Sequence, residues 1–118
     1  MATIEQLRPA GLLAWLVAMR EATPGREPLL LDVREGWELQ TAAVQPAGFT
    51  LLHIPMGEIA ARVGELAPGT PIACLCHHGA RSQRVAQFLL QQGLGPVVNI
   101  AGGIDAWSGE VDASVPRY

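Results

Sequence analysis

A cysteine at the end of an apolar run is the part of this chain best suited to chemistry. Cys76 directly follows the apolar run at residues 71–75. It precedes a segment, residues 82–92, whose apolar residues have helical spacing. The loop between them reads His77-His78-Gly79-Ala80-Arg81. In a strand-loop-helix unit, backbone N–H groups and the positive end of the helix dipole converge on such a thiol and stabilise its reactive thiolate form. The sequence therefore predicts that Cys76 is a nucleophile.

The residues around Cys76 receive more ordinary interpretations. Cys74 lies inside the apolar run, where a cysteine is usually a small packing residue. Arg81 has two interpretations, direct contact with an anionic donor or bracing of the loop through its carbonyls and a nearby carboxylate. His77 and His78 are expected at the pocket mouth, where imidazoles are either merely solvated or attract an anion. Gly79 permits a backbone conformation that a Cβ atom would resist.

Apolar segments alternate with helical patterns along the chain. Short apolar runs predict buried strands at residues 29–33, 49–54, 72–76 and 97–100. Helical spacing predicts helices at residues 9–21, 36–39, 58–66, 82–92 and 104–107. Strands separated by helices imply a parallel sheet covered on both faces, whose ligands bind at the carboxyl ends of the strands. We therefore expect one α/β domain over residues 1–118 with Cys76 at that edge.

Other polar and aromatic residues are expected to support this architecture. The charged residues after the strand at 29–33 are predicted to form ion pairs that fix the loops beside the site; they are Asp32, Arg34, Glu35 and Glu38. Tryptophan at helical positions is more often a core anchor than a substrate platform. On that ground we expect a core role for Trp15, Trp37 and Trp107.

Segments on both sides of the cysteine loop match one known family. The C-x4-R loop from Cys76 to Arg81 resembles the active-site loop of rhodanese-type sulfurtransferases. Residues 31–38 resemble the family's L-D-V-R-x-x-x-E segment, and residues 102–107 resemble its closing G-G-x-x-x-W signature. The stretch at 53–55, His-Ile-Pro, resembles the one before its middle helix. The resemblance implies a single rhodanese-like domain, with a central, mainly parallel sheet of about five strands and helices on both faces.

The same resemblance implies a sulfur relay through Cys76. The thiolate would attack the outer sulfur of a donor such as thiosulfate, release sulfite and become a persulfide. Cyanide in vitro, or a thiol in the cell, would then take the sulfur. The persulfide would be bound by the loop residues His77, His78, Gly79, Ala80 and Arg81. The expected partners are a small anionic sulfur donor and a thiol acceptor, either a small thiol or a thioredoxin-like protein, with no cofactor and no metal.

Two other functions are compatible with this fold. Rhodanese-fold cysteine phosphatases and arsenate reductases use a C-x5-R loop, because a tetrahedral oxyanion needs a wider cradle than a single sulfur. The four residues between Cys76 and Arg81 favour sulfur. Non-catalytic rhodanese-like modules bind or regulate a partner and have commonly lost the cysteine, which this chain keeps. Both functions stay open as alternatives.

Composition narrows the partners and the compartment. A net charge of −3 argues against nucleic acid, and the absence of lysine excludes a Schiff base on a lysine side chain. The apolar run at 11–19 is shorter than the ~20 residues needed to span a bilayer, and Glu5 stands where a signal peptide would carry positive charge. Cys74 and Cys76 are too close in sequence for a relaxed disulfide. We therefore expect a cytoplasmic protein without nucleic-acid or membrane partners.

Overall fold

Runs of leucine, isoleucine and valine form the central strands of the fold, because a parallel sheet buries both of its faces. The computed structural model describes residues 3–118 and contains a five-stranded sheet. Its strands are β1 (Glu5–Leu7), β2 (Leu29–Asp32), β3 (Thr50–His53), β4 (Ile72–Leu75) and β5 (Val97–Ile100). They lie in the order β1-β5-β4-β2-β3, and every neighbouring pair is parallel. The predicted α/β fold with a parallel sheet is confirmed.

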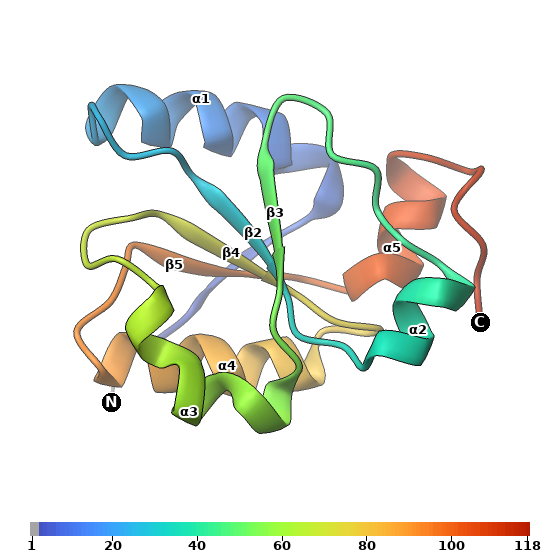
Figure 1. Cartoon of the computed structure of the whole chain (residues 1–118). Helices are drawn as coiled ribbons and strands as arrows, with labels where there is room; N and C mark the ends of the chain where they lie inside the picture. The colour runs from blue at the N-terminus through green and yellow to red at the C-terminus, as the bar shows by residue number, and fades with distance from the viewer. Residues whose placement is uncertain (1–2) are drawn as a thin grey trace.

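Helices cover both faces of the sheet (Figure 1). On one face lie α1 (Leu12–Ala22) and α5 (Gly103–Glu110); on the other lie α3 (Ile59–Arg62) and α4 (Ala80–Gln91). The short helix α2 (Gly36–Thr41) lies beyond the end of β2. Three 3₁₀ turns complete the set, at Pro9–Gly11, Met56–Glu58 and Val63–Glu65. The helix predicted at 58–66 is thus a short α-helix flanked by two 3₁₀ turns.

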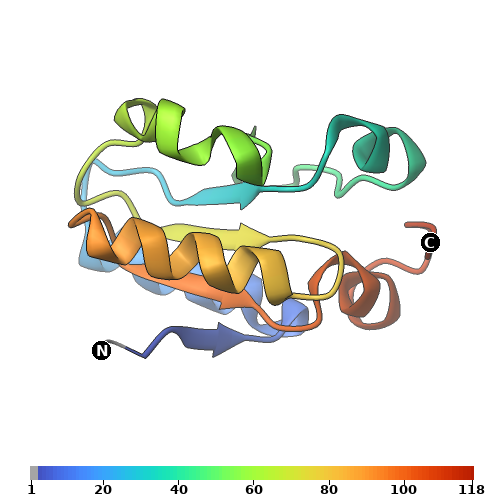
Figure 2. The same ribbon diagram turned by 90° about the horizontal axis from the view of Figure 1, so that it is seen from below.

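Alternate residues of the four longer strands, β2 to β5, enter two separate hydrophobic clusters, one on each face. On β2 and β4, Leu31 and Cys74 pack with the residues of α3 and α4. Their neighbours Leu30 and Ala73 pack with α1 and α5 on the other side. Seen from below, all strand arrows point to the edge where α2, α5 and the C-terminus lie (Figure 2). That edge carries the loop after β4, and with it Cys76.

Two parts of the fold differ from the sequence prediction or extend it. The edge strand β1 is not among the predicted strands, since it has only three residues and its first two are exposed. The C-terminal segment returns to the body of the protein: Val115 is buried in the α1–α5 cluster, and Ser108 Oγ donates to its carbonyl at 2.7 Å. Within residues 3–118, none of the helices has the length and apolar character needed to cross a membrane.

Candidate active site

Cys76 follows the last residue of β4, and its side chain is 1% exposed. Its Sγ accepts a hydrogen bond from the Gly79 backbone N–H at 3.1 Å and lies 3.2 Å from the Ser82 hydroxyl, which is within hydrogen-bond distance. Gly79 caps the N-terminus of α4 with a φ of +105°, which a residue with a Cβ adopts only under strain. The loop therefore curls back so that its own donors face the sulfur.

The first turn of α4 supplies further donors at this place. The N–H groups at the start of an α-helix point toward its N-terminus and have no intrahelical partner. Among the residues that the structure describes, no acceptor is found for the N–H groups of Ala80, Arg81 or Ser82. The first intrahelical bond runs from Gln83 N–H to Gly79 O at 3.1 Å. A negatively charged sulfur beyond Cys76 Sγ would meet these free donors and the positive end of α4.

The turn into α5 holds the opposite side of the same loop. The Ile104 and Asp105 N–H groups donate to the carbonyls of Cys76 and His77 at 2.9 and 3.2 Å. Gly103 brings them this close, because a Cβ built on it would lie 2.4 Å from both carbonyl oxygens. Its φ of +59° also lies in the left-handed region. The glycine pair of the G-G-x-x-x-W segment thus lets α5 cap the cysteine loop.

Arg81 binds a carboxylate with both terminal nitrogens. Its Nη1 and Nη2 each lie 2.7 Å from an oxygen of Glu38 on α2. Glu38 also accepts from the Glu35 N–H at 2.8 Å and from the Tyr118 hydroxyl at 2.8 Å. The Arg81 hydrogen bonds are the main cause that lowers the pKa of Glu38 to about 2. This geometry corresponds to the bracing interpretation of Arg81.

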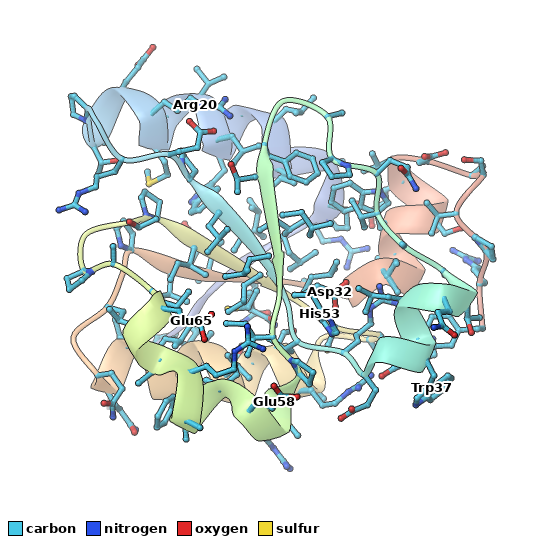
Figure 3. The ribbon with its side chains drawn as sticks, in the orientation of Figure 1. Arg20, Asp32, Trp37, His53, Glu58 and Glu65 are labelled. Carbon is cyan, nitrogen blue, oxygen red and sulfur yellow. The ribbon has the colours of Figure 1, made fainter. Side chains whose placement is uncertain are left out.

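A second ion pair lies behind the first and is more deeply buried. Arg34 is 0% exposed and donates from Nε and Nη2 to Asp32 at distances from 2.8 to 3.2 Å. Its Nη1 donates to the Tyr118 hydroxyl at 2.9 Å. His53 lies beside Asp32 at the ends of β3 and β2, and its Nε2 is 2.6 Å from the Arg34 carbonyl (Figure 3). The predicted ion pairs beside the site are confirmed for Asp32 and Glu38, while Glu35 contributes its backbone.

Two rings of the cysteine loop, His77 and His78, form a stack with the ring of Tyr118. The His77 ring stacks on His78 at a centroid distance of 3.9 Å and on Tyr118 at 3.8 Å. His78 is exposed, whereas His77 is partly buried and its Nε2 has no hydrogen-bond partner among residues 3–118. Burial, followed by the charge of His78, lowers the pKa of His77. His77 is therefore a neutral ring at neutral pH.

Trp37 contradicts its expected role as a core anchor. Its side chain is 63% exposed and points away from α2 into solvent (Figure 3). Trp107, by contrast, is buried between the sheet and α5, as expected. Trp37 contacts the edge of the Tyr118 ring at a centroid distance of 6.3 Å. Helical spacing alone does not predict whether Trp37 is buried, because α2 is short and projects beyond the sheet.

Cys74 lies apart from this chemistry. It is fully buried in the α3–α4 cluster, and burial raises the pKa of its thiol far above the usual range. A thiol that stays protonated is a poor nucleophile. Cys74 therefore has the packing role that its sequence position predicts.

Sequence reasoning missed three residues that contact the site. The sequence pattern predicts only a helix start at Ser82 and a strand at Asn99, and it predicts no contact for Tyr118. A polar residue in an otherwise apolar strand was the available signal for Asn99, which is 3% exposed. No local pattern predicts Tyr118, since its contacts with Glu38 and Arg34 are 80 and 84 residues away in sequence.

Comparison with known proteins gives consistent matches. A family model described as a rhodanese-like domain matches residues 12–110. A sulfurtransferase from Allochromatium vinosum is 36% identical over 80 residues, covering 68% of this chain and 71% of that protein. The maize adenylyltransferase and sulfurtransferase MOCS3-2 is 33% identical over 100 residues, or 82% of this chain, but the chain spans only 21% of its length. A rhodanese-like domain protein from Staphylococcus aureus superposes with a TM-score of 0.72 at 20% identity, covering 98% of this chain and 99% of that one, which shows the shared fold.

Proposed function

Since the chain belongs to the rhodanese-like domain family, we propose that Cys76 carries a sulfane sulfur from a donor such as thiosulfate to a thiol acceptor. One observation carries this proposal. The Cys76 sulfur is buried at the start of α4, beside the Gly79 N–H and the Ser82 hydroxyl; the first turn of α4 adds three N–H groups that have no acceptor among residues 3–118. Such a set of donors suits a negatively charged sulfur one bond beyond Sγ.

In the first step, the Cys76 thiolate attacks the outer sulfur of thiosulfate. A new S–S bond forms on Sγ, the S–S bond of the donor breaks, and sulfite leaves with the bonding electron pair. The terminal sulfur of the persulfide then carries the negative charge. We assign its binding to the backbone N–H groups of the loop and of the first turn of α4.

In the second step, an acceptor thiolate attacks the terminal sulfur and Cys76 leaves as a thiolate. The donors that stabilise the Cys76 thiolate for attack also make it a better leaving group. In the cell the acceptor would be a small thiol or the thiol of a thioredoxin-like protein, and cyanide would replace it in vitro. Cys74 and Cys76 are both free thiols, which suits a reducing compartment such as the cytoplasm.

Two features argue against the alternative function of a cysteine phosphatase. The loop has four residues between Cys76 and Arg81, one fewer than the phosphatase loop. Arg81 already gives both terminal nitrogens to Glu38, so its fork is not open to a phosphate oxygen. We therefore expect no hydrolysis of a small aryl phosphate.

The test is a sulfur-transfer assay from thiosulfate to cyanide or to a small thiol, run beside an aryl phosphatase assay. The proposal predicts transfer by the wild type and by Cys74→Ser, no transfer by Cys76→Ser, and no phosphatase activity in any of them. Phosphate release that depends on Cys76, without sulfur transfer from any donor, would reverse the assignment. Capture of a partner by Cys76→Ser as efficiently as by the wild type, with no transfer activity, would favour a binding module instead.

A further inference from the structure

Ser82 is fully buried and its hydroxyl lies among three acceptors. Oγ is 3.2 Å from Cys76 Sγ, 2.5 Å from Asn99 Oδ1 and 3.3 Å from the Gly79 carbonyl. A hydroxyl has one proton to donate and two lone pairs that can accept. At any moment, therefore, only one of these acceptors receives the Ser82 proton, and the others face a lone pair.

The orientation of the Asn99 amide decides which acceptor competes with the sulfur. Its Nδ2 donates to Gln6 Oε1 at 2.9 Å and to the Gly79 carbonyl at 3.2 Å. A reversed amide would bring Oδ1 against the Gly79 carbonyl, with two acceptors in contact. Gln6 lies opposite Asn99 in the β1–β5 register and is itself held through Nε2 by Gln83 Oε1 at 2.6 Å. Asn99 thus presents only an acceptor to Ser82.

We propose that Ser82 and Asn99 form a hydroxyl switch on Cys76. With Cys76 as a thiol, Ser82 donates to Asn99 Oδ1 and offers a lone pair to the Cys76 S–H. Once the thiol proton has passed to solvent, the Ser82 hydroxyl rotates and donates to the Sγ thiolate. Ser82 is then a catalytic residue, because it touches the reacting sulfur, and Asn99 is a positioning residue that competes for the Ser82 proton. This inference deepens the proposed function and rests on it only for the use of the Cys76 thiolate as the nucleophile.

The strengths of the two hydrogen bonds make the switch depend on the charge of the sulfur. A hydrogen bond to an ionised acceptor is roughly twice as strong as one between neutral groups. A neutral thiol is also a weak acceptor, so the amide oxygen wins while Cys76 is protonated. A thiolate is a stronger acceptor than the amide oxygen and receives the Ser82 hydrogen bond. The rotation then leaves the buried Asn99 Oδ1 without a donor, which costs free energy. Asn99 therefore lowers the fraction of thiolate that Ser82 would otherwise support.

The two residues should have opposite effects on the thiolate. Ser82→Ala removes a donor and should lower the rate of Cys76 alkylation by iodoacetamide at neutral pH roughly tenfold. Asn99→Leu, which has the shape of the amide but no acceptor, should raise that rate about threefold. In the double variant the Asn99 effect should vanish, because no hydroxyl is left to compete for. The ultraviolet absorbance of the thiolate should change in the same directions.

Several controls separate the switch from a loss of structure. Ser108→Ala removes another buried hydroxyl, which donates to the Val115 carbonyl on the far side of α5, and should leave the alkylation rate unchanged. Ser82→Thr keeps a hydroxyl and should restore most of the rate. Asn99→Ala serves as a second acceptor-free variant if Asn99→Leu does not fold. No variant alters an ionisable side chain: the charge of Cys76 interacts with Arg81 and Cys74, Arg81 pairs with Glu38, and all three are unchanged.

The outcomes distinguish this inference from the proposed function. Opposite single effects and a double variant equal to Ser82→Ala support the switch, even if the protein transfers no sulfur. An equal loss of alkylation in both single variants, additive in the double variant, would mean that both residues only support the loop and would overturn it. An unchanged rate in Ser82→Ala, with its fold intact by circular dichroism, would overturn it as well.

Discussion

The guanidinium of Arg81 is a permanent positive charge that interacts with Cys76, and Glu38 engages both of its terminal nitrogens. A planar guanidinium on a carboxylate makes two parallel, charge-assisted hydrogen bonds, which a lysine could not reproduce. Glu38 is buried, whereas the Arg81 side chain is 30% exposed, so only the carboxylate side of this pair lies out of water. At this position the chain uses arginine to fix the first turn of α4 against α2 rather than to leave a cation open to solvent.

Acid should break this brace in a defined pH range. The pKa of Glu38 is about 2 in the folded protein, below its ordinary value of 4.5. A depressed carboxylate pKa stabilises the fold above the ordinary value, and that stabilisation is lost as the pH falls through the folded value. Glu38→Gln should therefore be less stable than the wild type by on the order of 3 kcal/mol at neutral pH, and the difference should shrink between pH ~4.5 and ~2.

Denaturant unfolding at a series of pH values measures this difference. Glu65→Gln is the control, because Glu65 forms an exposed ion pair with Arg62 that solvent screens, and its effect should be small throughout. A stability difference for Glu38→Gln that stays constant down to pH ~2 would show that the carboxylate charge does not act as described.

At the scale of elements, the cysteine loop is held between the starts of two helices. The first turn of α4 faces the sulfur, and the first turn of α5 binds the carbonyls of Cys76 and His77. The start of α5 thereby satisfies N–H groups that would otherwise lack partners, whereas the first-turn N–H groups of α4 have no acceptor within residues 3–118. Gly103 makes the second contact possible, since the loop carbonyls occupy the space of its missing side chain.

Gly103→Ala should disrupt this docking. The new Cβ would meet two carbonyl oxygens at 2.4 Å and would also force alanine into a φ of +59°. We expect the free energy of unfolding to fall by at least about 3 kcal/mol, with loss of sulfur transfer. Denaturant unfolding and the transfer assay measure the two effects.

Gly25→Ala is the matched control for backbone strain alone. Gly25 has a φ of +83°, but a Cβ there meets no atom within 4 Å. Its cost should be about 1–2 kcal/mol, with transfer activity kept. Equal costs for the two variants would mean that close packing at Gly103 adds nothing to the strain of the turn.

At the scale of the whole molecule, the chain after α5 returns to α2, where Tyr118 contacts residues of the site. Tyr118 joins both ion pairs, since its hydroxyl donates to Glu38 and accepts from Arg34. Its ring stacks on His77 and meets the edge of Trp37. Segments from the first third, the second half and the end of the sequence thus meet at the carboxyl edge of the sheet.

Tyr118→Phe isolates the contribution of the hydroxyl, because the phenylalanine ring keeps the stack on His77. The change leaves Arg34 Nη1 with only the Glu38 carbonyl at 3.4 Å, in a place without solvent. The free energy of unfolding should fall by about 1–3 kcal/mol. Ser114→Ala removes an exposed hydroxyl bound to Asp112 and should change it by less than about 0.5 kcal/mol. A Tyr118→Phe protein as stable as the wild type would show that the hydroxyl bridge contributes nothing.

How far the sequence predicts this molecule depends on the distance over which each signal acts. Apolar runs predicted β2, β3, β4 and β5, because burial on both faces leaves a local pattern. The edge strand β1 has no such pattern, since its place is set by pairing with β5 about 90 residues later. The cysteine loop is likewise local, and Cys76 follows a predicted strand as expected.

The partners of the loop are not local, and this is why they could not be predicted. The Arg81–Glu38 pair joins residues 43 positions apart, and the Ser82–Asn99 bond spans 17. The sequence indicated that the carboxylates would pair but not with which cation. It left the two interpretations of Arg81 open, because only the three-dimensional position of α2 brings Glu38 to it. The prediction of a core role for Trp37 is wrong for a similar reason, because no local pattern shows that α2 projects from the sheet.

Persulfide formation on Cys76 is tested most directly by the intact mass of the protein after incubation with a sulfane-sulfur donor. Thiosulfate and a small persulfide would each be tried, followed by a thiol to remove the added sulfur. If Cys76 carries the sulfur as a persulfide, the wild type and Cys74→Ser gain the mass of one sulfur atom, which the thiol removes, and Cys76→Ser gains none. Sulfur that still adds to Cys76→Ser, or a wild type that gains none from either donor, would contradict it.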